Sequence, residues 1–439
     1  MEPIKQFLPV SSRSFHARFE DVDARIEGLS GQVDDISRAL DTALSQISRI
    51  CEAKDAIPGF YLIAEPGYPN FGDELIAREW LRYLAVLRPE APVYLDCTRP
   101  GPAAAILRRV HPSLVCVDTI SRMTFEFAAV EREKDGPGCL AERVSRRIQV
   151  ALDDEGAAAR YASGIHILQH EVRGVHFLGG GYMNGTWQEN LARLAVAPWA
   201  KRRGMTVLGT GLGLTPLNGE ARSYVEDTIA SFDCLTLRDE GSLAACGGAP
   251  GAELAPDDCF VNGLEGCYDV DPGAPDIMVC VQTDLVDHPE ALNAHVEAIL
   301  RSWGVGPGDE VGIVECNPYV DYPIFDWLSG AGFSCRLYPA IHLLERGFPV
   351  KSGGAQRWVT TRYHPHLLAS AFGCEGCFVP LGSEYYQLKH EAVLRMGSHW
   401  SEAPIGGAPL APGRGFDSPT LPRDYMSLIR RSARVLYGA

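Results

Sequence analysis

An arginine and a histidine stand two residues apart in the segment RWVTTRYHPHLLASAFG, which covers residues 357–373. The start of the segment predicts a strand, and His366 to Phe372 predict an apolar helix. Arg362 and His364 lie between the two, and ligands of open α/β sheets bind beyond the carboxyl ends of the strands. Such a histidine could simply fill space. Its position beside an arginine, which binds anions, favours acid–base chemistry.

A second group of polar residues follows the apolar run Phe60 to Ala64 in the segment FYLIAEPGYPNFGDELIAREWL. Tyr68, Asn70, Gly72 and Asp73 stand close together there, although a simple turn needs only one or two such residues. Asp73 could cap the predicted helix with Gly72 providing the turn, or its carboxylate could act as a base in a site. The sequence leaves these two explanations equal.

Three consecutive glycines, Gly179, Gly180 and Gly181, follow the apolar run of GVHFLGGGYMNGTW. Backbone without side chains can turn sharply and present N–H groups to an anion, but glycine-rich turns also occur for packing alone. Both explanations stay open. The glycines of VLGTGLGLTP lack the spacing and the later acidic residue of a dinucleotide-binding turn, so the signal for a nucleotide there is weak.

Arg238 follows a predicted strand in CLTLRDEGSL, and Asp239 opens the next helix. Ordinary helix capping explains the aspartate. It does not explain the arginine, whose charge is unfavourable at the positive end of the helix dipole. We therefore expect an anionic partner for Arg238, and an internal carboxylate and a bound ligand are equal alternatives.

Short apolar runs alternate with helical patterns after Pro58, which is typical of the α/β class with parallel sheets. The segment YDVDPGAPD, near residue 270, separates two sets of predicted strands. The first set is FYLIA, PVYLD, SLVCV, GVHFLGG, MTVLGTG and CLTLRD, and the second is IMVCVQ, EVGIVEC, FSCRLY, RWVTTRY and GCFVPL. We expect two Rossmann-like domains, residues 57–270 and 275–439, the second closed by a helix at RDYMSLIRRSARVLY.

Before the first strand, apolar residues recur alternately every four and every three positions between residues 22 and 50, with charged and polar residues between them. They are Val22, Ile26, Leu29, Val33, Ile36, Leu40, Ala43, Ile47 and Ile50. This narrow heptad seam of about four heptads, ~43 Å long, favours a coiled coil over a single helix lying on the globular body. We expect a tail over residues 1–18 and a helix over residues 19–54 that makes the chain a homo-oligomer.

The composition excludes some classes of function. A net charge of -16 disfavours broad nucleic-acid binding, which usually relies on a basic face. The first residues lack the apolar core of a signal peptide and no run is long enough to span a membrane, so we expect a cytoplasmic protein, with contact to a membrane surface left open. The 13 cysteines stand singly apart from Cys374 and Cys377, which have no second pair at metal-ligand spacing, so reduced thiols are expected rather than a zinc site.

Six segments in order resemble the polysaccharide pyruvyl transferase family over roughly residues 59–390: GYPNFGDELI, FLGGG, GTGLG, LTLRDEGS, LAPDDCF and TRYHPHLLASAFG. The resemblance implies a two-domain fold like that of GT-B glycosyltransferases, with the domains facing across a cleft. It also implies that phosphoenolpyruvate donates a pyruvyl ketal to two hydroxyls of a sugar, in a cell-surface glycan or glycolipid precursor. No metal and no cofactor are expected.

The resemblance is carried over position by position. It implies that Arg238 and Arg362 hold the donor and that His364 acts in catalysis. The glycine turn would border the donor through Gly180 and Gly181.

The same chemistry gives roles to the opening loop, where Asp73 would accept a proton from the acceptor, and Tyr68 and Asn70 would contact the sugar. Three features depart from the family pattern. Thr361 stands where many relatives have glycine, the triple glycine lacks a following acidic residue, and the coiled coil is an addition.

Two other functions compete with this interpretation. One is a GT-B-type glycosyltransferase that uses a nucleotide sugar, and the other is a non-catalytic assembly factor built on the coiled coil. The first is disfavoured because the sequence shows no strong signal for a site that seats a nucleobase and a diphosphate. The second is disfavoured because Arg238, Arg362 and His364 are all present.

Overall fold

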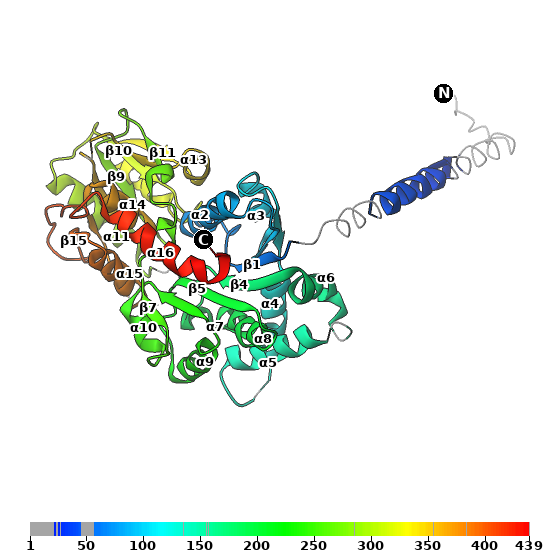
Figure 1. Cartoon of the computed structure of the whole chain (residues 1–439). Helices are drawn as coiled ribbons and strands as arrows, with labels where there is room; N and C mark the ends of the chain where they lie inside the picture. The colour runs from blue at the N-terminus through cyan, green and yellow to red at the C-terminus, as the bar shows by residue number, and fades with distance from the viewer. Residues whose placement is uncertain are drawn as a thin grey trace, which may run out of the picture. The chain divides into compact units, whose positions relative to one another are not determined.

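The computed structural model describes residue 22, residues 25–26, 28–44 and 57–438, with single gaps at 135, 155, 157, 285, 354 and 383. The chain divides into two units, Met1–Ile57 and Pro58–Ala439. In the first unit, the described residues between 22 and 44 are helical (Figure 1). The apolar residues of the predicted seam that fall in this helix are exposed, from 48% at Val22 to 68% at Ile36. Ile47 and Ile50 lie outside the described residues.

The second unit contains two parallel sheets. The first sheet has the strand order β3-β2-β1-β4-β5-β6-β7. Its strands are β1 (Gly59–Ile63), β2 (Val93–Asp96), β3 (Leu114–Val117), β4 (Val172–Phe177), β5 (Thr206–Leu212), β6 (Cys234–Leu237) and β7 (Ala252–Leu254). The helices of this half are α2 (Phe71–Leu87), α3 (Pro100–Ile106), α4 (Thr119–Arg132), α5 (Leu140–Asp153), α6 (Ala162–His166), α7 (Gln188–Leu191), α8 (Val196–Arg202), α9 (Gly219–Ile229) and α10 (Glu240–Ala245).

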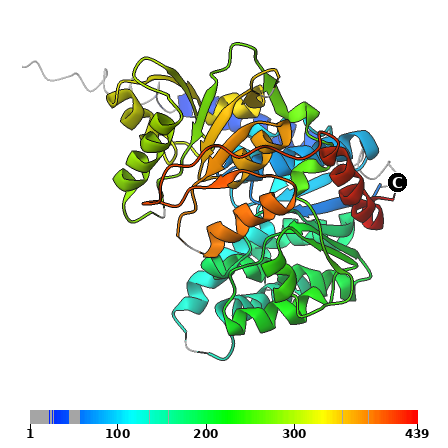
Figure 2. The same cartoon turned by 90° about the vertical axis from the view of Figure 1, so that its left-hand side faces the viewer.

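The second sheet has the order β11-β10-β9-β13-β14-β15 and lies to one side of the first (Figure 2). Its strands are β9 (Ile277–Cys280), β10 (Glu310–Val314), β11 (Ser334–Tyr338), β13 (Arg357–Thr360), β14 (Glu375–Phe378) and β15 (Ser401–Glu402). Its helices are α11 (Pro289–Ser302), α12 (Pro323–Gly330), α13 (Ala340–Glu345), α14 (Tyr363–Phe372) and α15 (Glu384–Arg395). A short parallel pair, β8 (Tyr268–Val270) and β12 (Phe348–Val350), stands apart from both sheets.

The alternation of side chains along each central strand divides the core. In β1, Phe60 and Leu62 pack into a cluster with α2, whereas Tyr61 and Ile63 pack into a second cluster with α5 and α8. Successive side chains of a strand point to opposite faces, so a strand buried on both faces must be apolar throughout. The first cluster also contains Met278 of β9, so one continuous core joins the two sheets.

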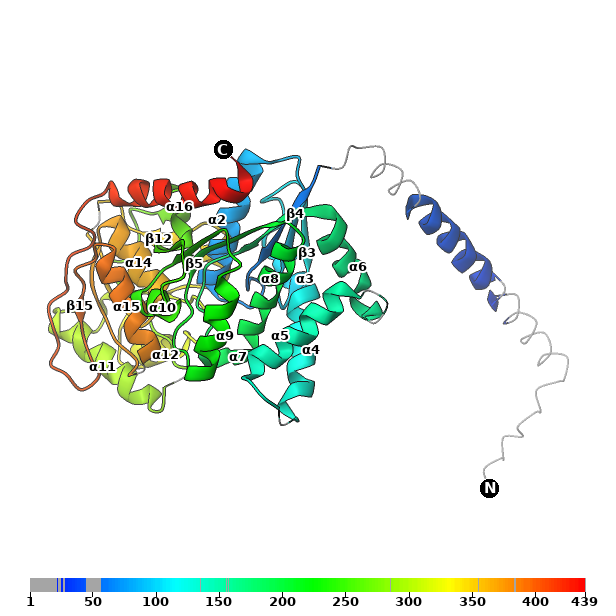
Figure 3. The same cartoon turned by 60° about the horizontal axis from the view of Figure 1, so that its bottom comes forward.

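The C-terminal helix α16 (Leu421–Tyr437) follows the second sheet in the chain but packs on β5 and β6 of the first sheet (Figure 3). The hydroxyl of Tyr437 and Nδ1 of the buried His176 in β4 lie 2.7 Å apart. The helix therefore ties the last described residues of the chain to the sheet that contains β1.

These observations confirm the predicted α/β class with parallel sheets, and every run predicted as a strand overlaps one. Two helix starts differ from the prediction. The helix α2 begins at Phe71, so Asp73 lies inside its first turn, and α14 begins at Tyr363 rather than at His366. No helix among the described residues combines the length and apolar character that a membrane span requires.

Candidate active site at the carboxyl ends of both sheets

A cavity of about 610 Å³ lies where strands of both sheets end. The carboxyl ends of parallel strands meet at one edge of a sheet, so residues far apart in the chain converge there. All of the sequence-predicted site residues line this cavity except Gly180: Tyr68, Asn70, Asp73, Gly181, Arg238, Arg362 and His364. Gly180 lies directly behind the lining, because a Cβ added there would come 3.3 Å from Oδ1 of Asp73.

His364 lies in the first turn of α14, and its Nε2 is 3.6 Å from Oδ1 of Asp257. The Asp257 side chain is fully buried, at the carboxyl end of β7. Burial would raise the pKa of this carboxyl, but the His364 imidazole and the Arg238 guanidinium outweigh burial and hold the pKa well below its usual range. Asp257 is therefore a fixed negative charge beside the imidazole.

Gly72 brings the imidazole against the helix of the other half of the unit. A Cβ added at Gly72 would overlap Nδ1 and Cε1 of His364. Gly72 does not adopt a positive φ, so the turn predicted at this residue is not the reason for a glycine here. The absence of a side chain at Gly72 leaves the space that the imidazole of His364 occupies.

Asp73 faces the same cavity but does not cap its helix. Asn70 occupies the N-cap position of α2, and its Nδ2 donates a hydrogen bond of 2.7 Å to Oδ2 of Asp73. Burial and the nearby charge of Glu65 raise the pKa of Asp73 to about 6, against the lowering effect of His364. The capping explanation for Asp73 is therefore wrong, and a carboxyl with this pKa can take up a proton near neutral pH.

Arg238 has an internal carboxylate partner and still lines the cavity. Its NH1 is 3.6 Å from Oδ2 of Asp257, and its guanidinium lies over the ring of Tyr363 at 4.9 Å. A Cβ at Gly213 would come within 2.8 Å of its Nε, so the GTGLG turn makes room for this arginine. Asp239 caps α10 as predicted, accepting a hydrogen bond from the backbone N–H of Ser242 at 2.7 Å.

Arg362 is held by Asp321, which sequence reasoning did not find. Its Nε lies 2.8 Å from both carboxylate oxygens, and its NH2 lies 2.5 Å from Oδ1. Burial would lower the pKa of Arg362, but the Asp321 carboxylate outweighs burial and raises the pKa above its ordinary value. Asp321 thus fixes the guanidinium of Arg362 through its Nε and NH2, and this group remains charged at the edge of the cavity.

Lys389 on α15 is a basic residue of the cavity lining that the sequence analysis missed, and Arg99 is another. Burial, with the nearby charge of Arg238, lowers its pKa well below the usual value, while Asp73 acts in the opposite direction. An anion bound beside Lys389 would raise this pKa. A lysine in the middle of a helix follows no strand, so the strand-end search had no signal for it.

The glycine turns have a structural reason as well. The N–H of Gly179 donates a hydrogen bond of 2.8 Å to Oδ2 of the buried Asp258. A Cβ at Gly179 or at Gly211 would crowd the same carboxyl group at 3.0 Å or less. Packing therefore accounts for Gly179, whereas Gly181 lines the cavity.

Three possible metal-ligating groups lie together at the edge of the cavity. Sγ of Cys280, Sγ of Cys316 and a carboxylate oxygen of Asp321 lie within 4.8 Å of one another. The Asp321 carboxylate already binds Arg362 and accepts hydrogen bonds from the N–H groups of Cys316 and Asn317, each at 2.9 Å. In this arrangement the carboxylate is used to fix the arginine.

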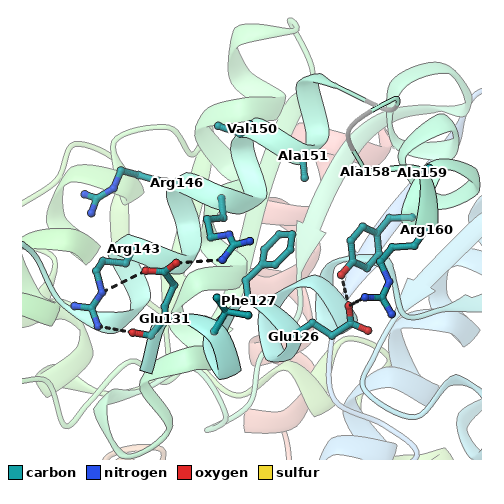
Figure 4. Close-up of a pocket in the computed structure, with 13 residues that line it drawn as sticks. Glu126, Phe127, Glu131, Arg143, Arg146, Val150, Ala151, Ala158, Ala159 and Arg160 are labelled. Carbon is teal, nitrogen blue, oxygen red and sulfur yellow. Dashed lines mark hydrogen bonds and ion pairs between the residues drawn. The ribbon is translucent and has the colours of Figure 1, made fainter. Parts of the chain in front are cut away.

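A second and larger cavity of about 750 Å³ lies between α4, α5 and the 3-10 turn Ala159–Tyr161. Its charges are paired: Arg143 and Arg147 lie beside Glu131, and Arg160 lies beside Glu126, as Figure 4 shows for the labelled residues. No sequence-predicted site residue lines this cavity. The sequence-predicted site residues instead line the smaller cavity of about 610 Å³.

A family model described as polysaccharide pyruvyl transferase matches residues 70–299, which is over half of the 439-residue chain. Among solved structures, UDP-GlcNAc 2-epimerase from Neisseria meningitidis bound to UDP-GlcNAc is 9% identical, with a TM-score of 0.44 over 87% of this chain and 94% of that chain. MurG from Acinetobacter baumannii is 11% identical, with a TM-score of 0.40 over 87% and 94%. No curated protein matches the chain.

Proposed function

Since the chain belongs to the polysaccharide pyruvyl transferase family and is therefore a transferase enzyme, we propose that it transfers the enolpyruvyl group of phosphoenolpyruvate to two hydroxyls of a sugar, forming a pyruvate ketal. The observation that supports this most strongly is the meeting of Arg238, Arg362 and Lys389 around His364 and Asp73 in one cavity. Three basic groups suit a small donor that carries both a carboxylate and a phosphate.

Each arginine has a fixed orientation before the donor arrives. Asp257 holds Arg238, and Asp321 holds Arg362 through two of its three nitrogens. A guanidinium that is already oriented loses less conformational entropy when it binds an anion. We assign donor binding to Arg238, Arg362 and Lys389, with Gly180 and Gly181 at the border of the donor site.

His364 acts as the general acid and base in this proposal. A proton from its imidazole reaches the methylene carbon of phosphoenolpyruvate and makes C2 cationic, and one sugar hydroxyl adds to C2. The C2–O bond to phosphate then breaks, and the second hydroxyl adds to C2 and closes the ring. One hydroxyl proton ends on the methyl group and the other leaves with phosphate, so donor and diol give ketal and phosphate in balance.

Asp73 takes the role of base toward the first attacking hydroxyl. It lies beside the imidazole, whose positive charge would lower the pKa of the carboxyl. Asn70 holds one carboxylate oxygen, and Tyr68, half exposed, lies on the same lining for contact with the sugar.

The exposed seam of the first unit suits a second copy of the chain. Apolar side chains at Leu29, Val33, Ile36 and Leu40 would otherwise remain in water. We propose that this helix pairs with its equivalent in another protomer as a coiled coil.

Thermal-shift measurements test the donor assignment. Phosphoenolpyruvate should raise the Tm of the full-length protein, and UDP, UDP-glucose and UDP-N-acetylglucosamine should not, because a ligand that binds only the folded state stabilises it. Stabilisation by the uridine compounds alone would identify a nucleotide-sugar glycosyltransferase and contradict the proposal.

A further inference from the structure

One wall of the cavity contains a carboxylate that the reaction described above does not use. Glu65 follows β1 at its carboxyl end and lines the cavity with 15% of its side chain exposed. Its Oε2 is buried and lies 2.5 Å from NH2 of Arg193, whose side chain is fully buried. The ion pair engages Oε2 of the carboxylate and fixes the side chain on the cavity lining.

The position of Arg193 is itself well determined. Its NH2 also lies 2.9 Å from the hydroxyl oxygen of Thr98, and its guanidinium lies 5.4 Å from the ring centre of Tyr182. A buried arginine with no carboxylate beside it is costly, so the ion pair also keeps Glu65 from rotating away. Glu65 is therefore held in place before any ligand arrives.

Asn190 adds an unsatisfied acceptor to the same wall. Its Nδ2 donates a hydrogen bond of 3.0 Å to the carbonyl oxygen of Tyr182, while its Oδ1 is buried and has no hydrogen-bond partner among the described residues. The residue is 8% exposed and lines the cavity. Buried polar atoms in folded proteins are nearly always paired, so this Oδ1 has capacity for one more hydrogen bond.

Three aromatic side chains also line this cavity, those of Tyr68, Phe125 and Trp187. A pyranose ring combines apolar C–H faces with hydroxyl donors around its edge. Aromatic surface together with a few fixed acceptors is the lining that such a ligand requires.

We propose that Glu65 and Asn190 form the subsite for the acceptor sugar, and that Glu65 accepts a hydrogen bond from the hydroxyl next to the one that faces Asp73. This inference rests on the proposed function and adds to it a specificity-determining pair. Asp73 and Glu65 are close enough for the charge of Glu65 to raise the pKa of Asp73. Two neighbouring carboxylates would thus receive the two hydroxyls of a diol, one as base and one as binding group.

The test compares Glu65→Gln with a matched control in the full-length protein. The control is Glu126→Gln, which also removes a carboxylate from a glutamate–arginine pair but lies in the other cavity. Binding of the methyl glycosides of glucose, galactose, mannose and N-acetylglucosamine is followed by saturation-transfer NMR without donor. We expect Glu65→Gln to weaken binding of the preferred glycoside roughly 10- to 100-fold and the control to leave it unchanged.

Glu65→Asp guards against misfolding of the glutamine variant, because it keeps a charge beside Arg193 and withdraws the carboxylate by one methylene. It should fold with the parent Tm and still weaken sugar binding. In turnover assays both variants should raise KM for the acceptor and leave KM for phosphoenolpyruvate unchanged.

Sugar binding without donor separates this inference from the proposed function. If the donor proves to be a nucleotide sugar, selective loss of glycoside binding in Glu65→Gln still supports the subsite. Parent-like glycoside binding in both Glu65 variants, or no binding of any glycoside by the parent protein, would overturn it.

Discussion

The imidazole of His364 rests against the backbone of Gly72, in space that any other residue would fill with its Cβ. The two residues are almost 300 positions apart in the sequence. Gly72 lies in the first turn of α2, which follows a strand of the first sheet, and His364 lies in the first turn of α14, which follows a strand of the second sheet. This contact explains why a glycine precedes Asp73, and it places the imidazole of His364 against the residue next to Asp73.

Gly72→Ala should therefore slow turnover strongly without unfolding the protein. The added methyl group would displace the imidazole, and a misplacement on the order of 1 Å can cost about 100-fold in rate. Gly101→Ala is the matched control, because Gly101 is also the second residue of its helix, α3, and a Cβ there meets nothing within 4 Å. Steady-state kinetics should show loss only in the first variant, and parent-like turnover in Gly72→Ala would contradict the contact.

Because of Asp73, the turnover rate should fall on the acidic side of its pH profile, near pH 6. Its pKa is raised to about 6, so the carboxyl is protonated below this pH and becomes a base above it. Turnover should rise as the pH passes from 5 to 7, and Asp73→Asn should lose both this rise and roughly 100-fold or more in rate. An unchanged pH profile in the variant would assign the rise to another group.

The raised pKa of Asp73 should also make the stability of the fold decrease as the pH rises. A carboxyl that binds its proton more tightly when folded stabilises the fold below its unfolded pKa of 3.8, and this contribution is lost as the pH rises through about 6. Asp73→Asn should therefore melt at a higher temperature than the parent at pH 7.5 and at a similar temperature at pH 4. Thermal denaturation without ligand at both pH values measures the difference.

Substitution of Arg362 should lower donor affinity, whereas substitution of His364 should lower turnover. Arg362→Lys cannot reproduce the planar fork that pairs with Asp321, so donor affinity should fall roughly 10- to 100-fold. His364→Ala should keep donor affinity and lose about 10²- to 10⁴-fold in turnover. Arg357→Lys, at the start of β13 and bonded to the backbone carbonyl of Trp303, is the control for the arginine. Equal donor affinity in both lysine variants would remove Arg362 from the donor site.

The exposed seam should determine the oligomeric state. A protein that begins at residue 57 keeps the unit Pro58–Ala439 complete. Light scattering should show fewer protomers per particle for this protein than for the full chain. Leu29→Asp with Ile36→Asp in the full chain should have the same effect, and Asp34→Ala with Arg38→Ala, on the polar face, should not. Equal protomer numbers for all of these proteins would exclude the coiled coil.

Sequence patterns predicted the sheets well because strands buried on both faces must be continuously apolar. The site residues after these strands were found for the same reason, since the ends of parallel strands converge whatever the details of the loops. Asp73 shows the limit of this reasoning. A capping aspartate and a catalytic one look alike in sequence, and only the position of Asn70 at the helix start separates them.

Sequence reasoning did not identify the partners of the site residues, although Asp257 stands in the quoted segment LAPDDCF. Asp257 and Asp321 each reach their arginine across a loop from a different strand, and local spacing does not encode such a pairing. Lys389 and Asn190 lie on helices, where a polar residue in the sequence usually faces water. Glu65 was adjacent to a quoted motif, but its value depends on Arg193, which is 128 positions away.

Turnover of the full-length protein with phosphoenolpyruvate and a panel of sugar acceptors, measured by phosphate release and mass spectrometry, tests the proposed reaction most directly. We expect one phosphate for each product molecule, a product heavier than its acceptor by pyruvic acid minus water, and neither signal with His364→Ala. Transfer of a sugar from a nucleotide donor, or the same ketal formed by His364→Ala at the parent rate, would contradict it.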